Sequence, residues 1–251
     1  MTTNWVVKAI IVLILFKPTT SWANDIYISQ SGDNIDMTIV QDGENNVISS
    51  VAGNTRKAPI SGNNTSTTFT QTGDNNDIGV YMSAGNGQQT VTQTGNTNYA
   101  TSDCHGNNCS TTITQYGNNN LANLEFGNGG DSDQTGTITQ DGDYNAAGIE
   151  ANGDDNTFVI DQDGDNNAVG GITGAPITGD NNILSITQDG DYMTFEGHLI
   201  GSNNSLTSFQ GGSANNSFIR VSTVGSNNTG DLRQGKRLDG NVDNNDSGNH
   251  E

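Results

Sequence analysis

The chain has 251 residues, of which 30% are hydrophobic and 6% aromatic, whereas an ordinary globular domain is roughly 45–50% apolar. A conventional apolar core is therefore not expected, and only a periodic placement of polar residues would distinguish this composition from that of a disordered chain. The formal net charge of −20 also excludes nucleic acid as a partner, because phosphate binding needs a basic patch and the chain has only eight Lys and Arg.

Residues 1–23 have the pattern of an export signal. Lys8 precedes an eight-residue apolar run over residues 9–16, and Ser21-Trp22-Ala23 offers small residues at the cleavage positions. We predict cleavage after Ala23, which leaves six basic and 28 acidic residues and a charge of about −22. The run is too short to span a bilayer, so the alternatives are a buried strand or a short anchor. No later segment is apolar enough to span a membrane.

A repeat dominates the sequence from residue 24 to residue 232. A Gln followed two residues later by Gly occurs nine times, and four of the eight intervals are 22 residues long. The Gln residues are Gln30, Gln41, Gln71, Gln93, Gln115, Gln140, Gln162, Gln188 and Gln210. The turn glycines after them are Gly32, Gly43, Gly73, Gly95, Gly117, Gly142, Gly164, Gly190 and Gly212. An Asn follows Gln by five places in seven copies, at Asn46, Asn76, Asn98, Asn120, Asn145, Asn167 and Asn215.

A second, weaker series of glycines lies between these copies, so a turn glycine recurs about every eleven residues. The residue two places before Gln is apolar in eight of the nine copies. This period-two pattern indicates a strand with Gln and the apolar residue on one face. The sequence therefore predicts an all-β fold: a β-solenoid of about nine two-strand coils, roughly 43 Å long at a strand spacing of ~4.8 Å.

The inward Gln and Asn side chains need partners, because an unpaired buried amide costs about 1–3 kcal/mol. Identical amides in register supply them: each donates to the coil on one side and accepts from the coil on the other, as in amyloid-like cross-β stacking. We therefore predict that the Gln and Asn form stacking ladders, with unpaired groups left only at the two ends.

Cys104 and Cys109 flank Gly106 at the positions that Gln and Asn take in the stronger copies. Both side chains are predicted to point inward across a turn. In an oxidising compartment they would form a disulfide, and a pair of buried thiols is the alternative. His105 does not complete a structural zinc site, because two Cys and one His lack the ligand spacing. No metal site is predicted.

Acidic turns such as Asp141-Gly142-Asp143 and Asp163-Gly164-Asp165 match the first ligand positions of a calcium loop, but they lack its later Gly and Glu. We interpret them as turn formers whose like charges oppose aggregation, with weak calcium binding as the alternative. His105, His198 and His250 are isolated, and no Ser, His and acid constellation recurs. No catalytic or cofactor-binding residue is therefore predicted.

The repeated Gln-x-Gly-x-x-Asn, with small or apolar residues beyond it, resembles the curlin repeat of the curli fibre subunits of Gram-negative bacteria. The resemblance implies export through the outer-membrane curli pore, polymerisation with itself and with a nucleating or companion subunit, and extracellular fibres for adhesion and biofilm matrix. Residues 233–251 are predicted to form a polar, disordered tail. Its basic residues Arg233, Lys236 and Arg237, with Arg220 before them, are similar to the basic terminal repeat of the nucleating subunit, so the choice between major and nucleating subunit stays open.

Two functions follow from this interpretation. The first is a structural subunit that adds coils end to end, with no enzymatic activity. The alternative is a monomeric solenoid that binds a ligand, such as a calcium-dependent surface adhesin or an ice-binding protein. Ice binders of this shape present an outward row of Thr. In this chain a Thr directly precedes Gln in five copies, and the alternation of the strand places it on the outward face. These residues are Thr70, Thr92, Thr114, Thr139 and Thr187.

Overall fold

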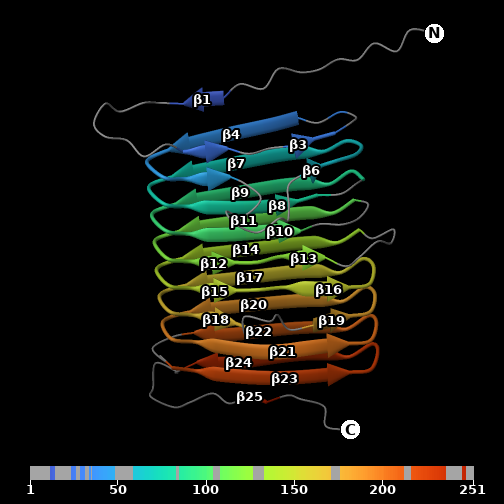
Figure 1. Ribbon diagram of the computed structural model, residues 1–251. Coiled ribbons are helices and arrows are strands. Elements are labelled where there is room, and N and C mark those ends of the chain that lie inside the picture. Colours follow the sequence, from blue (N-terminus) through green and yellow to red (C-terminus); the bar gives the residue numbers. More distant parts are fainter. Residues whose placement is uncertain are drawn as a thin grey trace, which may run out of the picture.

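The computed structural model describes residues 12–14, 24–26, 29–31, 34, 36–48, 59–82, 85–103, 108–126, 133–170, 176–211, 216–235 and 245–246. These residues form strands and turns and contain no helix. Consequently this part of the chain has no helix that could cross a membrane. The strands stack as the coils of a β-solenoid (Figure 1), which confirms the fold class predicted from the repeat.

The first sheet, which we call the Gln sheet, contains the strands of the Gln repeat. Its order is β1-β4-β7-β9-β11-β14-β17-β20-β22-β24-β25, and every pair is parallel except β24 with β25. The bounds are β1 Val12–Ile14, β4 Asp36–Asp42, β7 Ser66–Thr72, β9 Gln88–Thr94, β11 Ser110–Tyr116, β14 Thr135–Asp141, β17 Thr157–Asp163, β20 Ile183–Asp189, β22 Ser205–Gly211, β24 Thr229–Gly235 and β25 Asn245–Asp246.

The second sheet, which we call the opposite sheet, contains the return strands of the coils. In several coils the return segment consists of two short strands instead of one long strand. The order of this sheet is β13-β16-β19-β21-β18-β15-β12-β10-β8-β5-β2, with β23 beside β21. The bounds are β2 Asp25–Ile26, β5 Val47–Ile48, β8 Asp77–Tyr81, β10 Tyr99–Asp103, β12 Leu121–Ala122, β13 Glu125–Phe126, β15 Ala146–Ala147, β16 Glu150–Asn152, β18 Ala168–Val169, β19 Pro176–Thr178, β21 Thr194–Ile200 and β23 Phe218–Val224. A separate pair joins β3 Ser29–Gln30 to β6 Pro59–Ile60.

The core lies between the two sheets. Strands of the Gln sheet alternate exposed and buried residues, so β4 and β17 each bury every second side chain. The buried apolar residues stack coil upon coil, as Ile113 does on Ile138. Larger side chains fill places where a neighbour is small: Phe126 and Phe158 stack with ring centroids 5.9 Å apart, beside Gly136, where a Cβ would meet the Phe126 ring.

The turns require glycine for two reasons. At Gly95 the backbone has a φ of +116°, which disfavours residues with a Cβ. A Cβ at this position would also overlap the carbonyl oxygen of Gly117 in the next coil. Two residues further on, Thr97 takes a left-handed φ of 60°, where most other turns have Asn. The glycine therefore allows neighbouring coils to approach each other closely.

The structure corrects the expected coil count. Gln30 pairs in register with Ile60 in the two-stranded sheet and not with Gln41. The interval from Gln30 to Gln41 is about half a coil, so the two residues lie in strands of different sheets. The remaining eight Gln, from Gln41 to Gln210, pair in register and define seven turns of the solenoid. The stack continues to β24, where Gln234 pairs with Gln210.

The two ends of the stack differ from its middle. At the C-terminal end the inward residues of β23 and β24 are only partly buried, with Ile219, Val221 and Leu232 packed against the edge of the core. At the N-terminal end β1 pairs with residues 39–41 of β4. Since β1 lies within the predicted export signal, this pairing concerns the unprocessed chain, and the signal itself stays a prediction.

Candidate functional site

A ladder of glutamine amides runs through the interior of the solenoid. In each described step Nε2 of one Gln donates to Oε1 of the next, over 2.8–3.0 Å. From Gln71 to Gln210 the second amide hydrogen goes to a backbone carbonyl at the start of a strand in the opposite sheet, over 2.9–3.1 Å. The ladder therefore satisfies fully buried amides and also ties the two sheets together.

This Gln ladder has a direction, because every donor points toward the C-terminal end of the stack. At the N-terminal end Oε1 of Gln41 is buried and has no hydrogen-bond partner. At the other end Nε2 of Gln210 donates to Oγ of Ser217, 2.9 Å away. Oε1 of Gln234, in the following coil, also lacks a partner. The described ladder of amide bonds therefore ends at Gln210, and an Oε1 oxygen is unpaired at each end of the column.

An asparagine ladder runs along the turns that follow the Gln strands from Gln41 to Gln162. Asn98 is typical: its Oδ1 accepts the backbone N–H of Asn120 at 3.0 Å, and its Nδ2 donates to the carbonyl of Gly117 at 2.8 Å. The same arrangement joins Asn46, Asn76, Asn98, Asn120, Asn145 and Asn167. Each inward Asn therefore fixes the turn of one coil to the turn of the next.

The asparagine ladder ends differently from the sequence prediction. Asn215 lies outside the described residues, as do Gly32 and Gly212. The register of β21 with β23 places Ser217 below Met193 and so in the ladder column. The turn after Gln210 is two residues longer than the others, which explains why a fixed spacing from Gln missed Ser217. Met193 interrupts the ladder, although its backbone N–H still donates to Oδ1 of Asn167 at 3.0 Å.

The Gln and Asn ladders are the repeating chemistry of this chain, and one segment of them matches a known family model. The family model described as the curlin associated repeat matches residues 132–164. This segment contains β14 to β17, with Gln140, Asn145 and Gln162. The chain therefore contains a curlin associated repeat. Comparisons with curated proteins and with solved structures found no match.

The chain has a second asparagine ladder, which the sequence did not lead us to predict. The backbone N–H of Asn182 donates to Oδ1 of Asn156, that of Asn204 to Asn182, and that of Asn228 to Asn204, over 2.8–3.0 Å. These residues lie at the other end of the coil, in the four C-terminal turns. Each follows a turn glycine by three places, as in Gly201 to Asn204. This Gly-x-x-Asn spacing was the signal that could have identified them.

The acidic turns form a third ladder on the outside of the solenoid. Oδ1 of Asp143 accepts the backbone N–H of Asn118 at 2.7 Å, Asp165 accepts from Asp143, and Asp191 accepts from Asp165. In these contacts the carboxylates act as turn acceptors. Within the described residues, no three His, Cys, Asp or Glu side chains are placed to hold a metal ion. Weak calcium binding stays an untested prediction.

Cys109 points inward and is 2% exposed. It lies at the same end of the coil as the second asparagine ladder, in the column that continues to Asn156 and Asn182. Its sulfur is in a disulfide. The chain has two cysteines, and Cys104 lies outside the described residues.

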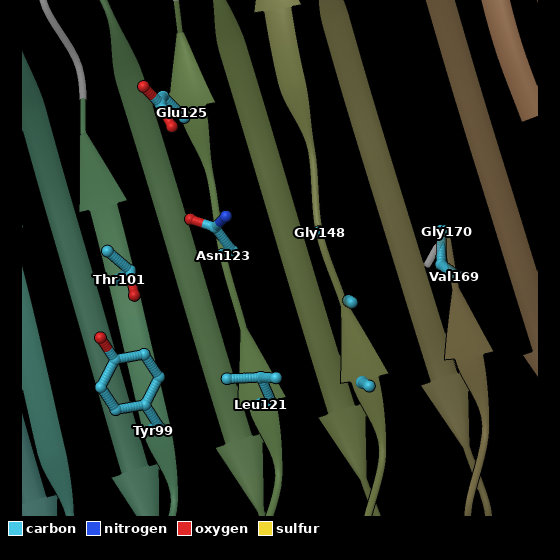
Figure 2. A pocket seen from close by; sticks show the side chains of 10 residues that line it. Tyr99, Thr101, Leu121, Asn123, Glu125, Gly148, Val169 and Gly170 are labelled. Atoms are coloured by element: carbon cyan, nitrogen blue, oxygen red, sulfur yellow. The ribbon is translucent and has the colours of Figure 1, made fainter. Parts of the chain in front are cut away.

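A shallow groove of about 290 Å³ crosses the outer face of the opposite sheet. Figure 2 shows side chains such as Tyr99 and Leu121 along one side, whereas Gly148 and Gly170 add no side chain to the floor. The lining residues are Tyr99, Thr101, Leu121, Asn123, Glu125, Ala146, Ala147, Gly148, Val169 and Gly170. Glu125 is the one ionisable carboxylate among them, so the groove does not contain a pair of acid and base groups.

Proposed function

We propose that this curlin-repeat protein is a structural subunit of an extracellular curli-type amyloid fibre, which grows by end-to-end stacking of its coils. The observation that carries the proposal is the direction of the Gln ladder. Gln41 presents an unused acceptor at one end of the stack. At the other end Gln234 lies in register with Gln210 in the same column, although Gln210 donates to Ser217 and Thr194 instead. A second copy placed below β24 in register would continue the ladder with the same donor-to-acceptor direction.

The backbone and core at the two ends support the same arrangement. β4 and β24 are the terminal long strands of one parallel sheet. Their outer edges are only partly covered, by β1 and by β25, so a strand of another copy could pair there once those short strands leave. The partly buried Ile219, Val221 and Leu232 would be covered by the first coil of the next copy. Such a contact joins two different surfaces, and a repeated contact of this kind gives an open filament.

The last described turn is also shaped to receive another coil. At Gly201 a Cβ would overlap the carbonyl of Gly225 in the next coil. At Gly225 itself the nearest atom to such a Cβ is Nδ2 of Asn228, 3.3 Å away. Gly225 nevertheless has a φ of +124°, the conformation of the turns inside the stack. The C-terminal end thus keeps a stacking turn that has no coil beneath it among the described residues.

Two short strands lie on the edges that would join. β1 covers part of β4, and removal of the predicted export signal would remove this strand. β25 pairs with only Leu232 and Arg233 of β24, so docking of another copy requires displacement of two residues. The proposal therefore includes processing of the N-terminus before assembly.

The family supports the remaining parts of the proposal. They are export through the outer-membrane curli pore, a nucleating or companion subunit as partner, location at the surface of a Gram-negative cell, and a role in adhesion and biofilm matrix. The role assigned to the chain is structural and not enzymatic.

The experiment compares fibre growth of the mature chain with that of two variants of β24, followed by thioflavin T fluorescence and electron microscopy. Gln234→Lys places a charge in the ladder column, whereas Thr229→Lys places the same charge on the outward face of the same strand. We expect wild type and Thr229→Lys to form fibres and Gln234→Lys to be strongly delayed. A wild-type chain that stays monomeric even with preformed curli seeds, or equal growth of both variants, would contradict the proposal.

A further inference from the structure

The outward face of the Gln sheet over β7, β9, β11 and β14 is unusually uniform. These strands bury alternate residues, so their first, third, fifth and seventh residues face outward. Eleven of the sixteen outward residues are Thr, and one, Asp141, is charged. We call this surface the threonine face. Its Thr residues are Thr68, Thr70, Thr72, Thr90, Thr92, Thr94, Thr112, Thr114, Thr135, Thr137 and Thr139.

The central threonines form two straight columns. The register pairs Thr68 with Thr90, Thr112 and Thr137, and in parallel it pairs Thr70 with Thr92, Thr114 and Thr139. Successive members of a column are ~4.8 Å apart, and the two columns are separated by about 6.6 Å, which is two residues along a strand. The sequence pattern before Gln showed one of these columns, and the register adds the second.

The fold alone does not explain this composition. Other β-forming residues would serve an outward strand position equally well, and the opposite sheet shows this. Its outward residues include Asp77, Tyr99, Leu121 and Glu125, with no repeated type. The chain carries 28 acidic residues, yet the eight column positions carry none. End-to-end stacking uses the inward ladders and the two ends, so it leaves the threonine face without a role.

The chemistry of the face restricts its ligand. A surface without charge in its centre does not select an ionic ligand, and Tyr116 at its edge is the one aromatic side chain available for stacking on a sugar ring. Each Thr presents a hydroxyl and a methyl group, and its β-branched side chain has few rotamers. A two-dimensional array of such groups fits a ligand that repeats in two dimensions. The column spacing and the spacing between columns are both close to oxygen repeats on faces of hexagonal ice.

We propose that the threonine face binds ice, with the hydroxyl groups bonded to lattice water and the methyl groups ordering the water between them. A second copy of the chain fits the face less well. Four strands at ~4.8 Å and seven residues at ~3.3 Å give about 440 Å², and a stable protein interface covers roughly 800 Å² on each partner. The proposal does not depend on fibre formation, because the complete face lies within one chain.

The test uses the fluorescently labelled mature chain, kept monomeric at low concentration and checked by sedimentation. Its concentration is measured in slowly growing ice and in the remaining liquid. Thr92→Lys changes the middle of the face, and Thr101→Lys is the matched control on the opposite sheet; circular dichroism verifies that both variants are folded. We expect several-fold enrichment of wild type and Thr101→Lys in ice relative to albumin, and exclusion of Thr92→Lys.

Three outcomes overturn the proposal. Wild type could be excluded from ice as albumin is, or the two variants could lose enrichment equally. The third outcome is self-association of the wild type that Thr92→Lys abolishes, without enrichment in ice, which would make a second copy the occupant of this face. Fibre growth of Thr92→Lys, measured separately, keeps this test distinct from that of end-to-end stacking.

Discussion

Nε2 of Gln115 donates to Oε1 of Gln140 in the next coil at 2.8 Å, and its other hydrogen goes to the backbone carbonyl of Tyr99 at 3.1 Å. Gln115 also accepts a hydrogen bond from Gln93. One fully buried side chain thus links three coils and both sheets.

The first prediction concerns this link. Gln115→Ala leaves the Gln93 amide without its ladder acceptor and Oε1 of Gln140 without a donor, both in the interior. We expect the free energy of unfolding of the freshly prepared monomer to fall by about 2–4 kcal/mol, since each unpaired buried group costs about 1–3 kcal/mol. Urea denaturation measures it. Thr114→Ala, on the outward face of the same strand, should change stability by well under half of that amount; similar losses would contradict the importance of the ladder.

The second prediction compares a turn glycine that contacts the next coil, Gly142, with a glycine that has open space around it, Gly148. Gly142 has a φ of +122°, and a Cβ there would overlap the carbonyl of Gly164. Gly142→Ala should therefore destabilise the fold by more than the ~1–3 kcal/mol expected of backbone strain alone. At Gly148 a Cβ meets nothing within 4 Å, so Gly148→Ala should be neutral or stabilise by about 0.4–1 kcal/mol through the unfolded chain. Thermal unfolding of both variants checks this contrast, and a stable Gly142→Ala monomer would refute it.

The solenoid could be predicted from the sequence because one pattern sets several levels of structure. Gln93 and Gln115 are 22 residues apart, and that interval places them in adjacent coils of one sheet. The period-two pattern around them makes the strand, and the glycines make the turns. A chain with so few apolar residues has few other ways to bury a periodic surface, so composition and repeat led to one fold class.

The errors arose where the interval between copies varies. Gln30 has the local sequence of the repeat, but its distance from Gln41 places it in a different sheet. Ser217 enters the asparagine column because the preceding turn is longer, a fact that spacing from Gln210 does not show. Gln234 was missed because its glycine follows directly. Register between coils depends on the length of every turn, and a local motif does not contain that information.

The third prediction concerns pH. Asp161 lies on the outward side of β17, and its pKa is raised by burial and by the charges of Asp163, Asp141 and Asp189. A carboxyl with a raised folded-state pKa binds its proton more tightly in the folded chain, so its ionisation at neutral pH destabilises the fold. The free energy of unfolding should therefore rise as the pH falls from neutral through this raised pKa toward the ordinary value of 3.8.

The variant Asp161→Asn tests this assignment by urea denaturation as a function of pH. It should be more stable than wild type at neutral pH and should lose this part of the pH dependence. Asp36→Asn, at the N-terminal end of the same sheet, is the matched control. If Asp36→Asn and Asp161→Asn change the pH profile in the same way, the effect comes from net charge and not from the acidic group around Asp161.

The fourth prediction concerns Cys109, which is buried in the column that carries Asn156, Asn182 and Asn204 further along the stack. A disulfide to Cys104 would close a loop of about six residues, and loop-closure entropy gives about 2 kcal/mol for that length. Mass spectrometry of the native secreted chain should find no alkylated thiol before reduction and two after it. Cys104→Ser with Cys109→Ser should lower the free energy of unfolding by that amount, whereas reduction of the double variant should change nothing. Two alkylated thiols in the unreduced chain would show instead that the column holds a pair of buried thiols.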